Sequence, residues 1–198
     1  MAPQLYLVTP PDADPERFGR TLMGVLNGPA VAALLLRRGS LDEPAFIRLA
    51  TQLVEIGQAA GAAVLLEDDI ALVRRTGADG VHVTGGGIEA LRAAIAALKP
   101  AGIVGVGNIA TRHDAMRFGE LDVDYVMFGP LEGAAAPAAV ELAQWWAETF
   151  EVPAVFSDPA AQSRTDGVEF VALSDSIWRA PDPAAALAAA ARALEEPA

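Results

Sequence analysis

The chain of 198 residues has the length of one domain, and 53% of its residues are apolar, which excludes a disordered chain. No apolar run reaches the ~20 residues of a membrane-spanning helix, and no secretory signal is visible, so we expect a cytoplasmic protein without a membrane anchor. Fourteen basic against 26 acidic residues give a net charge of −12, which repels nucleic-acid phosphates, so we expect no nucleic-acid partner. The absence of cysteine excludes a disulfide framework and a thiolate metal site.

Eight short apolar runs recur along the chain, each followed by a helical pattern or its remnant. The first is Leu5–Thr9, and the second, Val31–Leu36, is apolar throughout, as in a strand covered on both faces. The others begin near Ala62, Val81, Ile103, Tyr125, Ala154 and Phe170. Eight strand–helix alternations are typical of a (β/α)8 barrel, so the sequence predicts one α/β TIM-barrel domain over residues 1–198. A doubly wound open sheet is the alternative, but it more often uses fewer strands.

The helices between these runs are predicted from 3.6-residue spacing and from capping residues. Ser40 and Glu43 have the spacing of a capping box in front of a long helix. Asp182 is expected to cap a final Ala- and Leu-rich helix that runs to about Leu194. Residues 160–167 are polar and few, so we expect only a stunted helix there.

The chain is organised around residues 61–87, where two apolar runs flank a short helix, Ile70–Thr76. Such runs are most simply parallel strands, because parallel pairing requires a crossover connection. Polar residues gather where each strand ends, with the acids of residues 67–69 after the first and the glycines of residues 85–87 after the second. Ligands bind at the carboxyl ends of such strands, so we expect the functional site there.

Several of these segments, in their order, resemble the thiamine phosphate synthase family, which includes the TenI-type thiazole tautomerases. The resemblance rests on LYLVT, LLEDDIALVRRTGADGVHV, IVGVGN and DYVMFGPL, and it covers nearly the whole chain; ADGVH and DYVMFGP are its more specific parts. It implies a single small barrel that joins hydroxymethylpyrimidine diphosphate to a thiazole phosphate, with Mg²⁺, and releases diphosphate. A small-molecule ligand is therefore expected.

Carried over position by position, the resemblance implies six site residues. Arg37 matches the arginine of a Gln-x-Arg-x-Lys run that holds the diphosphate. Asp68 matches a metal-binding aspartate, whose oxygens suit Mg²⁺, and Glu67 stands in the place of the neighbouring asparagine. The remaining implied substrate contacts are Gly129, Ser174 and Ser176.

The chain departs from the family pattern at several of the same places. The Gln and Lys of the run are Leu35 and Gly39, and residues 85–87 contain no second metal-binding aspartate. Glu132 stands in a loop where the family has Thr and Lys, and Asp158 stands where the phosphate site of strands seven and eight normally begins with Gly-Gly. Each lost charge-assisted hydrogen bond is worth roughly 1.5–3 kcal/mol, so we expect a divergent member with weak or no synthase activity.

Two other functions stay open at this point. One is a non-catalytic thiazole- or pyrimidine-binding or regulatory paralogue, and the other is an enzyme whose acidic mouth takes a cationic or unphosphorylated substrate. Arg38 is a possible substitute for the missing lysine, although neighbouring strand residues point to opposite faces.

The two histidines are not expected to act as acid or base. His82 lies within a predicted strand, where we expect a packed, hydrogen-bonded side chain, and His113 lies on a predicted helix surface. An exposed aromatic helix face with Trp145 or Trp146 is compatible with a homodimer.

Overall fold

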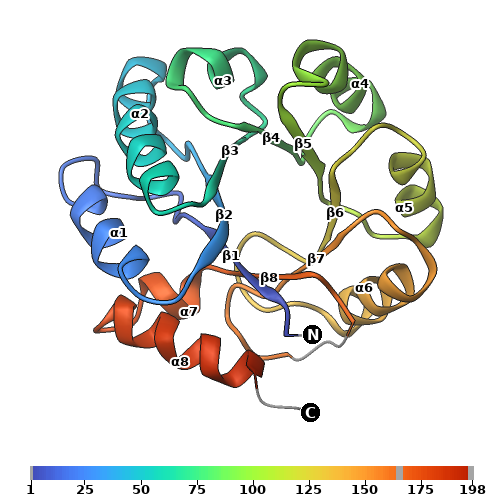
Figure 1. Ribbon diagram of the computed structural model, residues 1–198. Helices are drawn as coiled ribbons and strands as arrows, with labels where there is room; N and C mark the ends of the chain where they lie inside the picture. Colours follow the sequence, from blue (N-terminus) through green and yellow to red (C-terminus); the bar gives the residue numbers. More distant parts are fainter. Residues whose placement is uncertain (1, 164–166, 196–198) are drawn as a thin grey trace.

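A closed barrel of eight parallel strands forms the centre of the molecule, with helices around it (Figure 1). The computed structural model describes residues 2–163 and 167–195. The strands are β1 Gln4–Val8, β2 Val31–Leu36, β3 Ala63–Glu67, β4 Gly80–Val83, β5 Ile103–Val106, β6 Tyr125–Phe128, β7 Ala154–Ser157 and β8 Phe170–Leu173. They pair in chain order, and β8 closes the barrel on β1. This confirms the predicted TIM barrel and contradicts the open-sheet alternative.

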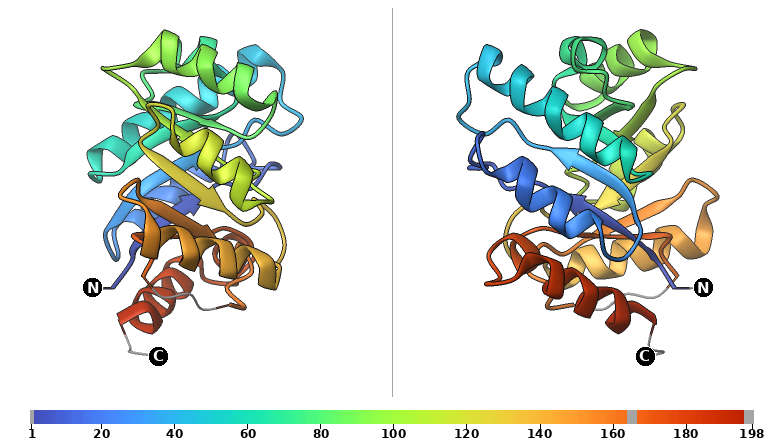
Figure 2. Two further views of the ribbon diagram at one scale, coloured as in Figure 1. Left: turned by 90° about the vertical axis from the view of Figure 1, so that its right-hand side faces the viewer. Right: turned by 60° about the vertical axis from the view of Figure 1, so that its left-hand side comes forward.

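The helices lie along the outside of the strands, and the last helix packs beside the first (Figure 2). They are α1 Phe18–Leu26, α2 Glu43–Ala59, α3 Ile70–Thr76, α4 Gly87–Leu98, α5 Arg112–Gly119, α6 Pro137–Thr149, α7 Asp175–Trp178 and α8 Pro183–Glu195. None of the helices described here combines the length and hydropathy needed to cross a membrane.

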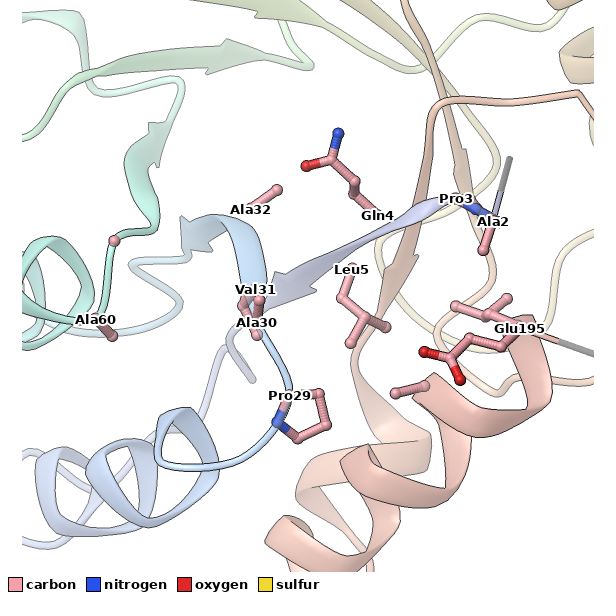
Figure 3. A pocket seen from close by; sticks show the side chains of 13 residues that line it. Ala2, Pro3, Gln4, Leu5, Pro29, Ala30, Val31, Ala32, Ala60 and Glu195 are labelled. Carbon is pink, nitrogen blue, oxygen red and sulfur yellow. The ribbon is translucent and has the colours of Figure 1, made fainter.

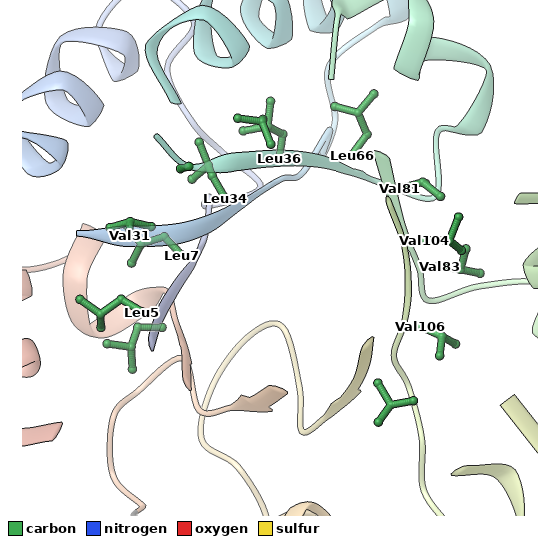
Figure 4. Close-up of a cluster of buried hydrophobic side chains, with 14 of the residues drawn as sticks. Leu5, Leu7, Val31, Leu34, Leu36, Leu66, Val81, Val83, Val104 and Val106 are labelled. Carbon is green, nitrogen blue, oxygen red and sulfur yellow. The ribbon is translucent and has the colours of Figure 1, made fainter. Parts of the chain in front are cut away.

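The strands are buried on both faces, and an apolar layer packs against each face. The outer layer joins strands to helices and includes outward-pointing residues such as Leu34, Leu36 and Val104 (Figure 4). The inner layer fills the barrel with the inward-pointing residues of the strands. It consists of Tyr6, Val8, Ala33, Leu35, Leu65, Tyr125, Met127, Val155 and Ala172. Burial on both sides explains why the strands are continuous apolar runs.

A hydrogen-bonded aromatic group lies inside this inner layer. The hydroxyl of Tyr125 lies 2.9 Å from the hydroxyl of Tyr6 and 2.8 Å from Nδ1 of His82, and the His82 and Tyr125 rings stack. Glycine at position 105 makes room for the group, since a Cβ there would lie 2.0 Å from Cζ of Tyr125. The expectation of a packed, hydrogen-bonded His82 is confirmed.

The structure corrects one local prediction about the helices and confirms another. The capping box at Ser40 is wrong: α2 begins at Glu43, and the side chain of Asp42, which lies directly before it, accepts a hydrogen bond from the amide of Ala45. Asp182 caps α8 as predicted. Of the stunted helix predicted for residues 160–167, residues 164–166 lie outside the described part, and the others are not helical.

The aromatic face proposed on α6 is only partly available. Trp146 is buried, and its ring lies close to Gly119 and Phe128, so the prediction of its exposure is wrong. Trp145 is half-buried, and the guanidinium of Arg112 lies 4.7 Å from the centre of its ring.

Candidate active site at the carboxyl end of the barrel

A cavity of about 300 Å³ opens at the carboxyl ends of the strands, and we call it the mouth cavity. It is lined by Arg37, Glu67, Thr84, Asn108 and residues 129–132. The structure thus brings together three of the residues predicted from the sequence, since Arg37, Glu67 and Gly129 all line it. Its position agrees with the rule that active sites of such barrels lie at the ends of the strands.

Arg37 carries the positive charge of the mouth cavity, and two carboxylates hold it. It follows β2, and its amide donates to Oγ1 of Thr9, which fixes the backbone at the strand end. Its Nε donates to Oε2 of Glu67 at 3.0 Å, and its Nη1 donates to Oε1 of Glu132 at 2.5 Å. Burial disfavours the charged guanidinium, but the two carboxylates outweigh this and raise the pKa of Arg37. The guanidinium therefore stays charged, with its charge shared between Glu67 and Glu132.

Asp68 joins the ends of β3 and β4. One carboxylate oxygen accepts hydrogen bonds from the amides of Thr84 at 2.7 Å and Gly85 at 3.1 Å, and the other accepts from the Thr84 hydroxyl. The backbone of Asp68 has a φ of 57°, a left-handed conformation that aspartate tolerates better than most residues. The carboxylate thus orders the glycine-rich turn in front of α4.

Arg38 does not take the place of the missing lysine. Its Nε donates to the carbonyl of Leu41, and its Nη1 lies 3.7 Å from the carboxylate of Asp69. It is not among the residues that line the mouth cavity. Alternation along the strand explains this, because Arg37 points inward and its neighbour points outward.

Residues 129–136, which we call the β6 loop, cross the mouth of the barrel. Gly129 has a φ of 104°, and a Cβ there would lie 2.1 Å from the carbonyl oxygen of Ser157, so glycine is required. Leu131 packs on the inner apolar layer. At the far end of the loop, the amide of Gly133 donates to Oδ2 of Asp175 at 3.3 Å.

Asp158, which follows β7, is almost fully buried at 1% exposure. Its Oδ1 accepts a hydrogen bond from the amide of Ala135 in the β6 loop at 3.2 Å. Its Oδ2 accepts from the amides of Gln162 at 2.8 Å and Ser163 at 2.6 Å. Three backbone donors therefore compensate this carboxylate for its loss of water.

The two predicted serines lie at the end of β8, outside the mouth cavity. Ser174 is buried at 2% exposure and begins the turn into α7. The amide of Ser176 donates to the carbonyl of Pro159, while its Oγ is buried and has no hydrogen-bond partner in the part of the chain described. Neither serine is therefore among the residues that line the cavity of Arg37.

Thr84 and Asn108 are cavity residues that the sequence prediction did not include. Nδ2 of Asn108 donates to the carbonyl of Thr84 at 3.3 Å, so the two strand ends are linked. Thr84 directly follows a predicted strand and Asn108 lies two residues beyond the next one, so the rule that strand ends carry the site would have found them.

A second cavity, of about 380 Å³, lies at the opposite end of the barrel, where the strands begin (Figure 3). It is bordered by Gln4, Val31 and the end of α8 near Leu194. No group of three acidic, histidine or cysteine side chains placed to hold a metal occurs among residues 2–163 and 167–195, at either end.

The closed parallel barrel, with polar groups at the carboxyl ends of its strands, defines a TIM-barrel protein whose candidate site lies at that end. The sequence model of the thiamine monophosphate synthase family matches residues 5–177. The chain therefore belongs to this family.

Relatives and solved structures agree with this assignment. The thiamine-phosphate synthase of Rhodospirillum centenum is 37% identical over 93% of this chain and 94% of its own. That of Hyphomonas neptunium is 35% identical over 98% and 94%. The fold matches the thiamine phosphate pyrophosphorylase of Pyrococcus furiosus with a TM-score of 0.81, at 18% identity, over 97% of this chain and 95% of that one.

Proposed function

We propose that this protein is a divergent family member that binds a small molecule in the mouth cavity and catalyses the joining of hydroxymethylpyrimidine diphosphate and thiazole phosphate weakly or not at all. The observation that carries the proposal is the position of Arg37 between Glu67 and Glu132. A diphosphate needs cationic partners, and here two carboxylates already neutralise the cation of the cavity. Bringing a diphosphate to Arg37 means displacing them or accepting their repulsion.

The donor groups at the mouth do not fit a Mg²⁺ site of the family kind. Mg²⁺ requires nearly ideal octahedral oxygen ligation. Both oxygens of Asp68 accept hydrogen bonds from Thr84 or Gly85, and Glu67 is paired with Arg37. Residues 85–87 offer only backbone. We therefore propose that Asp68 holds the β4 turn and route no chemical step through a metal ion.

A second candidate function is supported by the exposure of one carboxylate. The Glu132 side chain is 56% exposed beside a cavity that also presents Thr84 and Asn108. A cationic or unphosphorylated substrate would find a hydrogen-bond acceptor there without a charge penalty. The non-catalytic binding paralogue is the third outcome that the experiment below separates.

Purified full-length protein, Mg²⁺ and both family substrates test the proposal, with the Rhodospirillum centenum relative assayed in parallel as the reference. Loss of three charge-assisted hydrogen bonds at roughly 1.5–3 kcal/mol each predicts turnover about 10³-fold or more below the reference. Thiazole phosphate binding without turnover would favour the binding paralogue. Turnover within about tenfold of the reference would contradict the proposal.

We further propose a cytoplasmic setting without a nucleic-acid partner, which the net charge of −12 and the lack of cysteine support. A homodimer stays a prediction, and of the two tryptophans of α6 only Trp145 is partly available for it. Cell fractionation tests the location, and sedimentation equilibrium tests the oligomeric state.

A further inference from the structure

Barrels of this class frequently hold a phosphate group with the loops after the seventh and eighth strands and with a short extra helix. The protein has these parts: Asp158 follows β7, and the four-residue helix α7 stands between β8 and α8 (Figure 1). The amide of Ser176 at the start of α7 donates to the carbonyl of Pro159, and the side chain that gathers backbone donors at this end of the barrel is that of the residue before it.

That side chain is Asp158, which lies inside the protein and not at the solvent edge. Its carboxylate accepts hydrogen bonds from three amides, those of Ala135, Gln162 and Ser163. They come from two separate segments, the β6 loop and the residues after β7, so they converge on one point. Converging backbone amides in a buried place form a typical anion-binding site. Here the bound anion is covalently part of the chain.

A second carboxylate, that of Asp175, also accepts a hydrogen bond from the β6 loop. Oδ2 of Asp175 accepts from the amide of Gly133, and its Oδ1 lies 3.2 Å from Nε of Arg179. The β6 loop is thus tied at Gly133 and at Ala135 to the protein's own carboxylates. The loop can therefore lie over the barrel in the absence of any anionic ligand.

We propose that Asp158 is a built-in substitute for a ligand phosphate, so that the place after β7 where the amides of Ala135, Gln162 and Ser163 converge does not accept a phosphate group in the wild type. The proposal rests on the proposed function and adds the class of ligand. A ligand of the protein therefore places no phosphate group at this position.

The experiment removes the built-in anion and offers a free one. Asp158→Gly leaves the three amides of Ala135, Gln162 and Ser163 in place without their acceptor. We expect the Tm of this variant to lie below that of the wild type and to rise with inorganic phosphate, saturably and by at least about 4 °C. Phosphate should bind the variant at least about tenfold more tightly than the wild type, by equilibrium dialysis at constant ionic strength.

The matched control is Asp42→Gly, which also removes a carboxylate from a backbone amide, that of Ala45, but at the start of α2. Phosphate should not raise its Tm beyond the effect on the wild type. Recovery of Asp158→Gly by formate but not by phosphate would show that the space fits only the missing carboxylate, and would overturn the proposal. Equal phosphate effects on the wild type and Asp158→Gly would overturn it as well.

If Asp158→Gly does not fold alone, refolding with phosphate replaces the melting experiment. Recovery of the near-ultraviolet circular dichroism of the wild type supports the proposal, and no recovery at 50-fold molar excess or above contradicts it. Synthase turnover by the wild type would defeat the proposed function without changing either result, so the two failures are distinguishable.

Discussion

The guanidinium of Arg37 and the carboxylate of Glu67 meet at 3.0 Å across the ends of β2 and β3. Arg37 also forms an ion pair with Glu132, so it is bound to the β6 loop even without a ligand. The neighbouring acid, Asp68, likewise serves the protein, because Thr84 and Gly85 donate to it. The charged side chains at this end of the barrel thus have their ion-pair and hydrogen-bond partners within the protein.

Removing the two carboxylates should return Arg37 to anion binding. The double variant Glu67→Gln, Glu132→Gln keeps side-chain size but deletes two negative charges beside the guanidinium. We expect it to bind inorganic diphosphate at least about tenfold more tightly than the wild type, measured by isothermal titration calorimetry. Glu141→Gln, on the exposed face of α6, is the control for net charge and should not change the affinity. A double variant that binds no better than this control would disprove the neutralisation of Arg37.

Asp68 should contribute to stability and not to metal binding. Asp68→Asn weakens the hydrogen bonds from Thr84 and Gly85 and should lower the free energy of unfolding by about 1–3 kcal/mol, measured by urea denaturation. The loss should be the same with and without Mg²⁺. The exposed Asp122→Asn provides a control that should be neutral. Stabilisation of the wild type by Mg²⁺ that vanishes in Asp68→Asn would instead identify a metal ligand.

His82 should make the protein sensitive to mild acid. Burial lowers the pKa of His82 to about 4, although the charge of Asp68 opposes this, whereas the unfolded chain has the ordinary value of 6.5. The unfolded state therefore binds more protons between these values, and stability is lost as the pH falls from 6.5 to 4. The contribution of this residue to stability, about 3 kcal/mol, is present in full above pH 6.5 and is lost by about pH 4.

Urea denaturation at a series of pH values measures this dependence. His82→Asn should show a correspondingly smaller loss between pH 6.5 and pH 4, while His113→Asn, at an exposed position on α5, should follow the wild type. Identical pH profiles for the wild type and His82→Asn would refute the assignment to His82.

Glycine at position 105 should be indispensable for the inner layer. A Cβ there would lie 2.0 Å from Cζ of Tyr125, whose ring stacks on His82, so Gly105→Ala forces the ring to move. We expect a loss of about 1–3 kcal/mol in the free energy of unfolding. Gly61→Ala meets no atom within 4 Å and serves as the control for a glycine substitution, although its φ of 84° adds backbone strain. A Gly105→Ala variant no less stable than the wild type would contradict this packing.

The barrel could be predicted from the sequence because its strands obey a local rule. Val31–Leu36 is buried on both faces, and such burial requires an apolar residue at every position. An unbroken apolar run of this kind is visible in the sequence itself. The bounds of α3, Ile70–Thr76, and the cap at Asp182 could also be predicted. These features depend on residues that are close in the chain.

The contacts of the mouth could not be predicted in this way. Arg37 and Glu132 are 95 positions apart, and their pairing depends on how the β6 loop crosses the barrel. The loop in turn is held by the amide of Ala135, which donates to Asp158, a residue that the sequence marked only as a departure from the family's Gly-Gly turn. Family resemblance identified Arg37 as a site residue, but its charge partners follow from the three-dimensional arrangement alone.

The central claim is that Glu67 and Glu132 neutralise Arg37 in the mouth cavity. It is tested most directly by a crystal structure of the wild type soaked with diphosphate and Mg²⁺. The account predicts that Arg37 still contacts Glu67 and Glu132 and that no ordered diphosphate lies beside it. An ordered diphosphate bound to Arg37, with Mg²⁺ on Asp68, would contradict it.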